Sequence, residues 1–153
     1  MGSDGTSPVA LMSIEPEFAF KLLSGEKQVE FRKIAFSSPI THVLIYATNP
    51  IKQLVGFFEV DVVEVGSPSS LWERYKKVGG ITRSRFRDYY EGHAQGVAIK
   101  VKAIQRFADP ISLPMLDPTL KPPQSFQYLP AETLLNLGPS IVSGSRQARG
   151  SKR

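Results

Sequence analysis

The stretch QLVGFFEVDVVEVG, residues 53–66, is the longest predicted strand of the chain and decides its fold class. Apolar and acidic residues alternate from Phe58 to Val62, and successive side chains of a strand point to opposite faces of a sheet. One face of this strand is therefore predicted to be buried and the other polar. Gly56 interrupts the pattern, which indicates a bulge or a close approach of another backbone.

Further strands are predicted on both sides of this stretch, from runs rich in β-branched residues that end at turn-forming residues. They cover residues 9–14, 28–33, 42–48 and 96–107. The connections between residues 34 and 55 are too short for crossover helices, so the strands are expected to pair mainly antiparallel.

Short helices are predicted between these strands. Pro16 suits the first position of one helix and Gly25 the position just past its end. Ser67-Pro68 begins a second helix, Thr82 caps a third, and residues 131–138 form a short candidate near the C-terminus. This order predicts an α+β fold: a small, closed or partly closed β-barrel with helices covering its ends.

The composition excludes several classes of protein. The chain of 153 residues has no cysteine, so disulfides and thiolate metal sites are absent. His42 and His93 lack ligand-like spacing, and neither a metal nor a cofactor is expected. There is no apolar run of about 20 residues and no secretory signal, so the sequence predicts a cytoplasmic protein without membrane attachment.

The net charge of +5 is concentrated at the C-terminus. Residues 139–153 carry four basic residues and no acidic one, which leaves 15 basic and 14 acidic residues in the remainder. We therefore divide the chain into a flexible lead (1–8), one folded domain (9–138) and a basic, disordered tail (139–153) that adds non-specific phosphate contacts.

The stretch SGEKQVEFRK, residues 24–33, raises the functional question. On a strand, Val29 and Phe31 face one way and Glu30 and Arg32 the other. The charged pair is either a solvated strand face, as most charged strand faces are, or the floor of a binding cleft. The spacing alone leaves both interpretations open.

This stretch fits Gly-x-Lys-x-x-Glu-x-Arg and resembles the signature of the ASCH family, a branch of the PUA-like superfamily of small β-barrels. The similarity continues through SIEPEFAFKLL, LIYATNPIKQLVGFFEVDVVEV and SPSSLWERYKKVGG, and covers about residues 11 to 113. PPQSFQYL (122–129) resembles the closing segment of ASCH proteins of bacteria and their prophages.

The resemblance implies a module that binds nucleic acid, RNA more than DNA, single-stranded or structured. Lys27, Glu30 and Arg32 are then expected to line a basic cleft. Further contacts are expected from Tyr46, Thr48, Asn49, Lys52, Gln124 and Ser125. Tyr46 is either a stacking platform or a core aromatic, Lys52 meets either phosphate or water, and Gln124 and Ser125 either read a base edge or form a plain turn.

The resemblance also implies two enzymatic alternatives. One branch of the family hydrolyses the amide of acetylated cytidine with a threonine, a lysine and a glutamate. Lys27 matches the lysine, but Glu30 occupies the position of the threonine, which counts against that mechanism. A ribonuclease using Lys27 and Glu30 is the other enzymatic alternative, and a regulatory module that binds a small ligand or a peptide is a third class.

The helix TRSRFRDYYEG, residues 82–92, carries Arg83, Arg85 and Arg87 among aromatic residues. The aromatic side chains are expected to dock this helix on the barrel. Arg87 is expected to pair with Glu91 four residues on, and the other two arginines to be solvated. The alternative is that the arginines contact phosphate groups.

Overall fold

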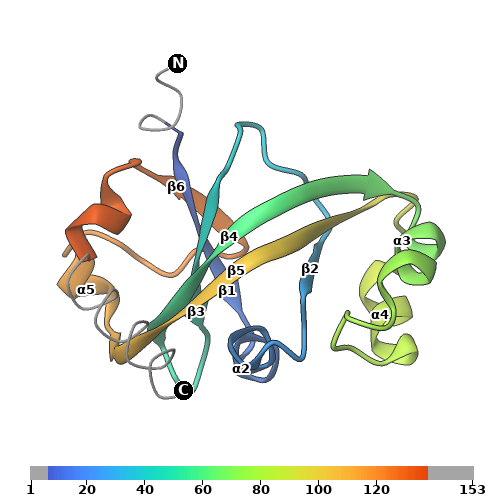
Figure 1. Ribbon diagram of the computed structural model, residues 1–153, viewed down its shortest axis with the longest axis horizontal. Helices are drawn as coiled ribbons and strands as arrows, with labels where there is room; N and C mark the ends of the chain where they lie inside the picture. Colours follow the sequence, from blue (N-terminus) through green and yellow to red (C-terminus); the bar gives the residue numbers. More distant parts are fainter. Residues whose placement is uncertain (1–6, 138–153) are drawn as a thin grey trace, which may run out of the picture.

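The structure is a computed structural model that describes residues 7–137. Its strands are β1 (Val9–Ile14), β2 (Val29–Arg32), β3 (His42–Ala47), β4 (Gln53–Gly66), β5 (Gly96–Ile111) and β6 (Phe126–Leu129). Its helices are α2 (Pro16–Ser24), α3 (Pro68–Tyr75), α4 (Arg83–Tyr90) and α5 (Leu113–Leu116). Figure 1 shows α3 and α4 together at one end of the molecule and α5 at the other.

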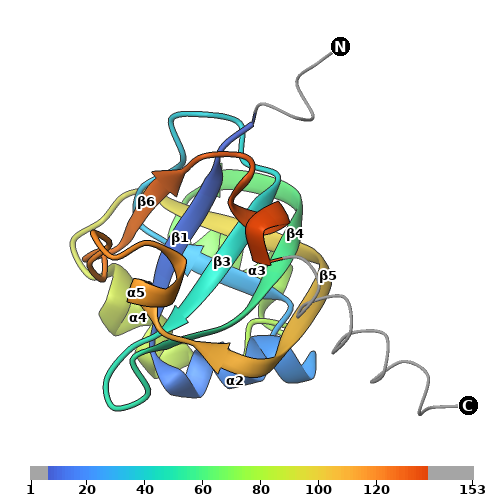
Figure 2. The ribbon, with the colours of Figure 1, turned by 90° about the vertical axis from the view of Figure 1, so that its left-hand side faces the viewer.

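The strands form one six-stranded sheet in the order β2-β5-β4-β3-β1-β6. All neighbouring strands pair antiparallel except β1 and β3, which pair parallel with Ala10 opposite Val43. Figure 2 shows β1 between β3 and β6. The predicted α+β class with a mostly antiparallel sheet is confirmed, and β6 is a strand in addition to the five that were predicted.

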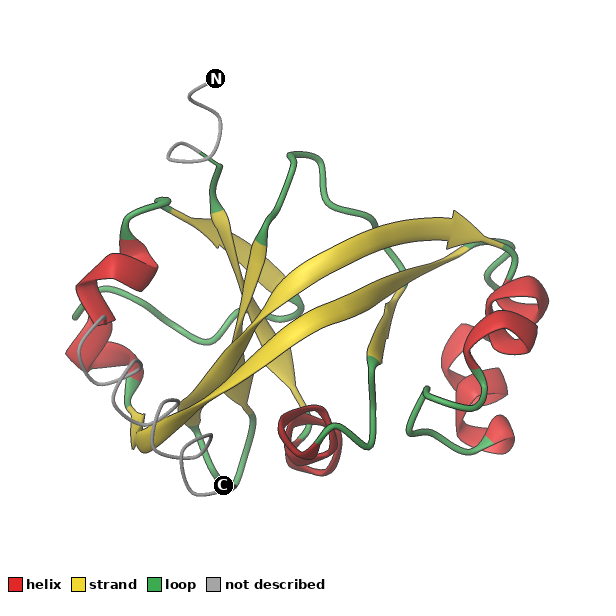
Figure 3. Ribbon diagram, viewed as in Figure 1, coloured by secondary structure: helices red, strands yellow, loops and turns green. Residues whose placement is uncertain are grey.

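The two long strands β4 and β5 run the length of the molecule and carry the bend of the sheet (Figure 3). Their pairing shifts register between Leu54 and Gly56 and again between Glu59 and Val62. A Cβ atom at Gly56 would collide with the Gln105 carbonyl oxygen and lie 2.7 Å from Leu23 Cδ2. Gly56 therefore lies at a bulge and also at a close backbone approach, which are the two roles that its position in the strand predicted.

Three groups of buried apolar side chains hold the sheet and helices together. The first lies between the sheet and α2 and includes Met12, Leu22, Ile45, Phe58 and Ile99. The second lies on the other side of the sheet, against α5, and includes Leu11, Leu44, Tyr46, Leu54 and Phe107. The third joins β2 to α3 and α4 and includes Val29, Phe31, Leu71, Tyr75, Phe86 and Tyr90.

The helix ends follow the predicted signals. Pro16 is at the start of α2, and Gly25 follows its end with φ 87°, a left-handed conformation that glycine adopts without strain. The hydroxyl oxygens of Ser67 and Thr82 accept the backbone N–H of Ser70 and Arg85 at the starts of α3 and α4. These caps determine where α3 and α4, the two helices that cover the third core group, begin.

The ends of the chain are described in part. Residues 133–137 are helical, as expected for the short C-terminal candidate. The predicted basic tail, residues 139–153, and most of the predicted lead, residues 1–8, lie outside the described residues. Between residues 7 and 137, no helix combines the length and the apolar composition that crossing a membrane requires.

Candidate functional site

The cleft lies where the curved sheet stays open, between β2 at one edge and the end of β1 near the other. It has a volume of about 550 Å³, within the range of small-molecule sites. Lys27, Glu30 and Arg32 form its floor, Glu15 and Phe18 line it from α2 and the turn before it, and Arg85, Asp88 and Tyr89 line it from α4. Thr48 and Gln124 also line it. We refer to this space as the cleft.

The two faces of strand β2 have different surroundings. Val29 and Phe31 join the apolar group under α3 and α4. Glu30, opposite Ile99 in the ladder, and Arg32, opposite Val97, project to the other face. The side chains of Glu30 and Arg32 are 7% and 12% exposed, so the pair is not a solvated strand face but the floor of a concave site.

Lys27 is the most enclosed charged residue of the floor. Its side chain is 3% exposed. Its Nζ donates a 2.6 Å hydrogen bond to the Gly79 carbonyl oxygen and lies 5.0 and 5.1 Å from the ring centroids of Phe18 and Phe31. Burial lowers the pKa of Lys27 below its usual value, and the Glu30 carboxylate opposes this shift only in part.

Glu30 bridges the two cations. Its Oε2 accepts a 2.9 Å hydrogen bond from Arg32 Nη1, and its Oε1 lies 3.9 Å from Lys27 Nζ. Within residues 7–137, Glu30 Oε1 accepts no hydrogen bond. The one enclosed side-chain polar atom without a partner in these residues is Arg32 Nε, so Oε1 is not enclosed. Oε1 is therefore open to the cleft and can accept a hydrogen bond from a ligand.

Arg32 also connects the two edges of the sheet. Its Nη2 donates a 2.8 Å hydrogen bond to the Ser125 hydroxyl, just before β6, and its Nη1 lies 3.4 Å from the Ser13 carbonyl oxygen at the end of β1. Since β2 and β6 are the edge strands, this one guanidinium spans the gap that the backbone ladder leaves open.

The structure gathers some of the other predicted site residues around the cleft and places others outside it. Thr48 and Gln124 line it, and Ser125 contacts it through Arg32. Asn49 and Lys52 are exposed in the turn after β3 and do not line it. Tyr46 is 5% exposed and belongs to the second core group, so the roles foreseen for Tyr46, Asn49 and Lys52 stay predictions.

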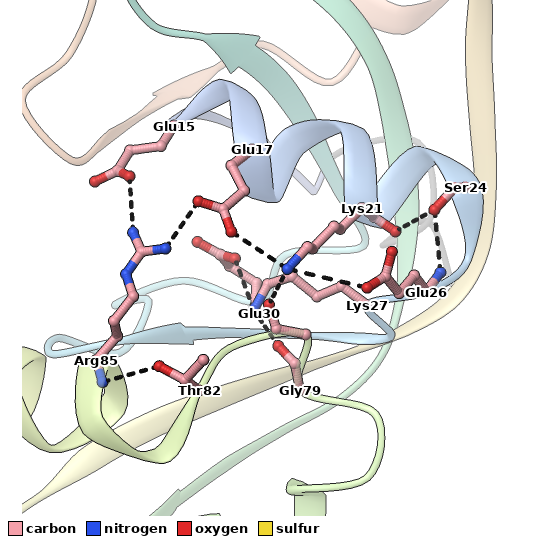
Figure 4. Close-up of polar contacts among 11 residues, drawn as sticks. Glu15, Glu17, Lys21, Ser24, Glu26, Lys27, Glu30, Gly79, Thr82 and Arg85 are labelled. Atoms are coloured by element: carbon pink, nitrogen blue, oxygen red, sulfur yellow. Dashed lines mark hydrogen bonds and ion pairs between the residues drawn. The ribbon is translucent and has the colours of Figure 1, made fainter.

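Sequence reasoning missed the contact between α4 and α2 at the mouth of the cleft. Arg85 donates a 2.8 Å hydrogen bond to Glu17, lies 3.4 Å from Glu15, and stacks 4.7 Å from the Phe18 ring centroid. Figure 4 shows both glutamates pointing from α2 and the turn before it toward this guanidinium. The hydrogen bond to Glu17 raises the pKa of Arg85.

The charges around the cleft balance. Lys27, Arg32 and Arg85 are matched by Glu15, Glu30 and Asp88. Phe18, Phe31, Phe86 and Tyr89 add aromatic surface to the walls. A flat, polar and uncharged ring fits this lining better than a phosphate group. Within the described part of the chain, no three His, Asp or Glu side chains are grouped so that they could hold a metal ion.

Comparisons with known proteins give a consistent result. No family model matches the chain. The chain is 35% identical over 127 residues to the ASCH domain-containing ribonuclease of Zymomonas mobilis, which covers 80% of this chain and 85% of that protein. A crystal structure of ASCH from Zymomonas mobilis superposes with a TM-score of 0.77 at 32% identity, over 84% of this chain and 92% of that one.

A second similarity involves part of a longer protein. The chain is 34% identical over 125 residues to the large ribosomal subunit protein uL22 of Ureaplasma parvum. The matched region is 81% of this chain but only 40% of that protein.

Proposed function

Because the chain belongs to the ASCH family and has its PUA-like fold, we propose that it binds RNA and that the cleft holds one unpaired nucleotide. Proteins read single-stranded RNA mostly by stacking splayed bases on aromatic rings and by hydrogen-bonding their edges. We place this activity in the cytoplasm, as the sequence predicts.

The floor of the cleft carries this proposal. Glu30 Oε1 is an open acceptor, and the ammonium of Lys27, with one hydrogen bond to Gly79, has donors to spare. Such an acceptor beside a donor matches a base edge that combines an exocyclic amine with a ring nitrogen or carbonyl. Arg32 holds Glu30 in place, and Phe18 and Tyr89 supply ring surface.

The remaining predicted residues have secondary roles in this proposal. Thr48 and Gln124 contact the ribose or another edge of the base, since they line the cleft beside its charged floor. Ser125 orients Arg32 through its hydroxyl. Asn49 and Lys52 contact the flanking RNA from the turn after β3. Tyr46, which is buried, takes the other role foreseen for it, that of a core aromatic.

The test replaces the open acceptor without changing its shape. Glu30→Gln is expected to lower the affinity for a single-stranded RNA 12-mer about tenfold, because one hydrogen bond to a charged group is worth about 1.5–3 kcal/mol. Glu26→Gln removes the same charge from an exposed position and is expected to bind normally. Affinity is measured by fluorescence anisotropy, and circular dichroism verifies the fold. Equal binding by both variants would falsify the assignment of the cleft.

A ribonuclease is the second candidate. The Zymomonas relative is named a ribonuclease. Burial lowers the pKa of Lys27, as is needed for an amine that acts as a general base near neutral pH. Incubation of a labelled 12-mer with the wild-type protein and with Lys27→Met tests it. Cleavage by the wild type alone supports an enzyme, and an intact substrate at high protein concentration rejects it.

The remaining alternatives are distinguished by the same preparations. An amidohydrolase of the acetylcytidine type predicts release of acetate from acetylated cytidine. A module for a small ligand or a peptide predicts that the native protein is recovered with that molecule and without RNA.

A further inference from the structure

Four of the residues that line the cleft are exposed, and we call them the rim: Glu15, Arg85, Asp88 and Gln124. The charged side chains of the floor, in contrast, are only 3% to 12% exposed. In the proposed function the base lies on this floor, where Glu30 offers an open acceptor. The sugar joins the base to a backbone that runs outside the cleft, so it must lie at the rim.

The charges of the rim do not suit a phosphate group. The one cation of the rim, Arg85, donates a 2.8 Å hydrogen bond to Glu17 and lies 3.4 Å from Glu15. Two carboxylates therefore already neutralise this arginine, and Asp88 adds a further negative charge to the rim. A phosphate placed here would be repelled, whereas the uncharged hydroxyl groups of a sugar would not.

Asp88 is the carboxylate of the rim that has no partner. It lies three residues after Arg85 and therefore on the same side of α4, but the Arg85 guanidinium points toward Glu15 and Glu17 instead (Figure 4). Among residues 7–137, no side chain forms an ion pair or a hydrogen bond with the Asp88 carboxylate. Both of its oxygens are thus free to accept a hydrogen bond from a ligand.

The stability of α4 does not explain the presence of Asp88. The residue lies in the last turn of the helix, where the negative end of the helix dipole disfavours a carboxylate. The helix itself is held firmly, because Phe86 and Tyr90 are buried, with ring centroids 4.9 Å apart, and Thr82 caps its N-terminus. A fixed element therefore presents to the cleft a carboxylate that does not stabilise the fold.

The sugar of RNA carries the donor that such an acceptor needs. An ionised carboxylate accepts hydrogen bonds and donates none. Inside a nucleic-acid strand, the 2′-hydroxyl of ribose is a donor that DNA lacks, and it allows a protein to distinguish the two. Carboxylates bind the same hydroxyl group in dinucleotide-binding domains. We propose that Asp88 accepts a hydrogen bond from the 2′-hydroxyl of the nucleotide in the cleft and thereby selects RNA against DNA. This inference rests on the proposed RNA binding.

The test measures, by fluorescence anisotropy, the binding of one single-stranded 12-mer in three forms. These are RNA, the 2′-deoxy form with uracil in place of thymine, and the 2′-fluoro form, which keeps the sugar pucker of RNA but cannot donate a hydrogen bond. The wild type is expected to bind RNA about tenfold more tightly than the other two forms, because each of them lacks one hydrogen bond to a charged group. Asp88→Ala is expected to bind all three forms with similar affinity.

Glu91→Ala is the matched control. Glu91 is an exposed carboxylate at the same end of α4, but it does not line the cleft. Within the described chain it does not form the pair with Arg87 that the sequence predicted. Removal of either negative charge strengthens the general attraction of all three forms alike, and this effect cancels in the ratio of their affinities. Glu91→Ala is therefore expected to keep the wild-type preference for RNA.

The outcomes separate this inference from the proposed function. A preference for RNA that is lost in Asp88→Ala and kept in Glu91→Ala, with unchanged circular dichroism spectra, supports the inference. A wild type that binds all three forms equally, or an Asp88→Ala variant that keeps the preference, overturns the inference and leaves the RNA-binding cleft in place. Failure of the wild type to bind RNA overturns both. If Asp88→Ala does not fold, Asp88→Asn replaces it, and an undiminished preference for RNA in that variant overturns the inference.

Discussion

Lys27 shows how one residue links the fold to the site. It lies two residues after Gly25, the glycine that follows the end of α2. Its aliphatic chain packs against Gly80, where an added Cβ atom would lie 2.7 Å from Lys27 Cβ. Its ammonium reaches the Gly79 carbonyl oxygen and the carboxylate of Glu30. The glycines thus make the space in which the charge is buried, and this burial lowers its pKa.

The lowered pKa predicts a pH dependence of stability. The charged form of Lys27 is less favourable in the folded than in the unfolded chain, so its cost to stability is full at pH values below the lowered pKa. The cost is relieved as the pH rises toward 10.5, the ordinary value of lysine. The free energy of unfolding of the wild type, relative to Lys27→Met, is therefore expected to increase between pH 7 and pH 10.

Urea denaturation of both proteins across this range measures the difference. The comparison with Lys27→Met cancels the titration of groups that both proteins share. A difference that stays flat, or that falls with pH, contradicts the assigned cause of the shift.

Gly56 gives a second prediction at the residue scale. Gly56→Ala is expected to lower the free energy of unfolding by about 1–3 kcal/mol, the usual cost of overpacking, because the new methyl group meets backbone that cannot move aside. Gly66→Ala is the matched control on the same strand, since its Cβ would lie 3.1 Å from the Ser70 hydroxyl, which can rotate away. Chemical denaturation of both variants checks this, and equal losses would reject the steric explanation.

At the scale of elements, α4 is attached to the domain by two different kinds of contact. Phe86 and Tyr90 anchor its buried side. On its exposed side, Arg85 joins it to α2 across the mouth of the cleft. The N-cap and the aromatic side were predictable from the sequence. The Arg85 contact was not, because Glu17 is 68 residues away in the chain and nothing local indicates the pairing.

The exposed contact predicts a local and salt-dependent effect on α4. Arg85→Gln is expected to increase amide hydrogen exchange in residues 83–90 while the exchange of β4 and β5 is unchanged, because the tie to α2 is lost and the core anchor remains. High salt is expected to reproduce part of this increase in the wild type, since exposed ion pairs are screened.

Arg83→Gln is the control, because Arg83 has no partner in the described chain. Exchange in α4 that is the same in both variants, or unaffected by salt, contradicts the role given to Arg85.

At the scale of the whole molecule, the sheet was predictable in its strands but only partly in its order. The alternating patterns gave the strands up to β5, and short connections indicated antiparallel pairing. β1 and β3 can pair in parallel because β2, which lies between them in the sequence, pairs with β5 instead. β6 lies in a proline-rich region without a clear strand pattern. Both are decided by contacts distant in sequence, as is the cleft whose floor Glu30 and Arg32 form.

Arg32 is expected to stabilise the whole sheet because it joins β2 to the segments at the opposite edge. Arg32→Met is expected to lower the free energy of unfolding by about 3 kcal/mol, since it removes the hydrogen-bonded partner of the buried Glu30 carboxylate and leaves Lys27, 3.9 Å away, as its remaining cation. Amide exchange in β6 is expected to increase at the same time. Lys33→Met, at the exposed neighbouring position, is the control. Unfolding measurements that show no difference between the two variants would contradict this role.

The pairing of β1 with β6 also bears on when the protein becomes functional during its synthesis. β1 leaves the ribosome before the other strands of the sheet, but its outer neighbour, and with it Gln124 and the Ser125 partner of Arg32, is made more than 100 residues later. A nascent chain that has reached only β5 can form most of the sheet, yet the gap beside β2 stays unbridged. Translation of the last segment of the domain is therefore the step that completes the cleft.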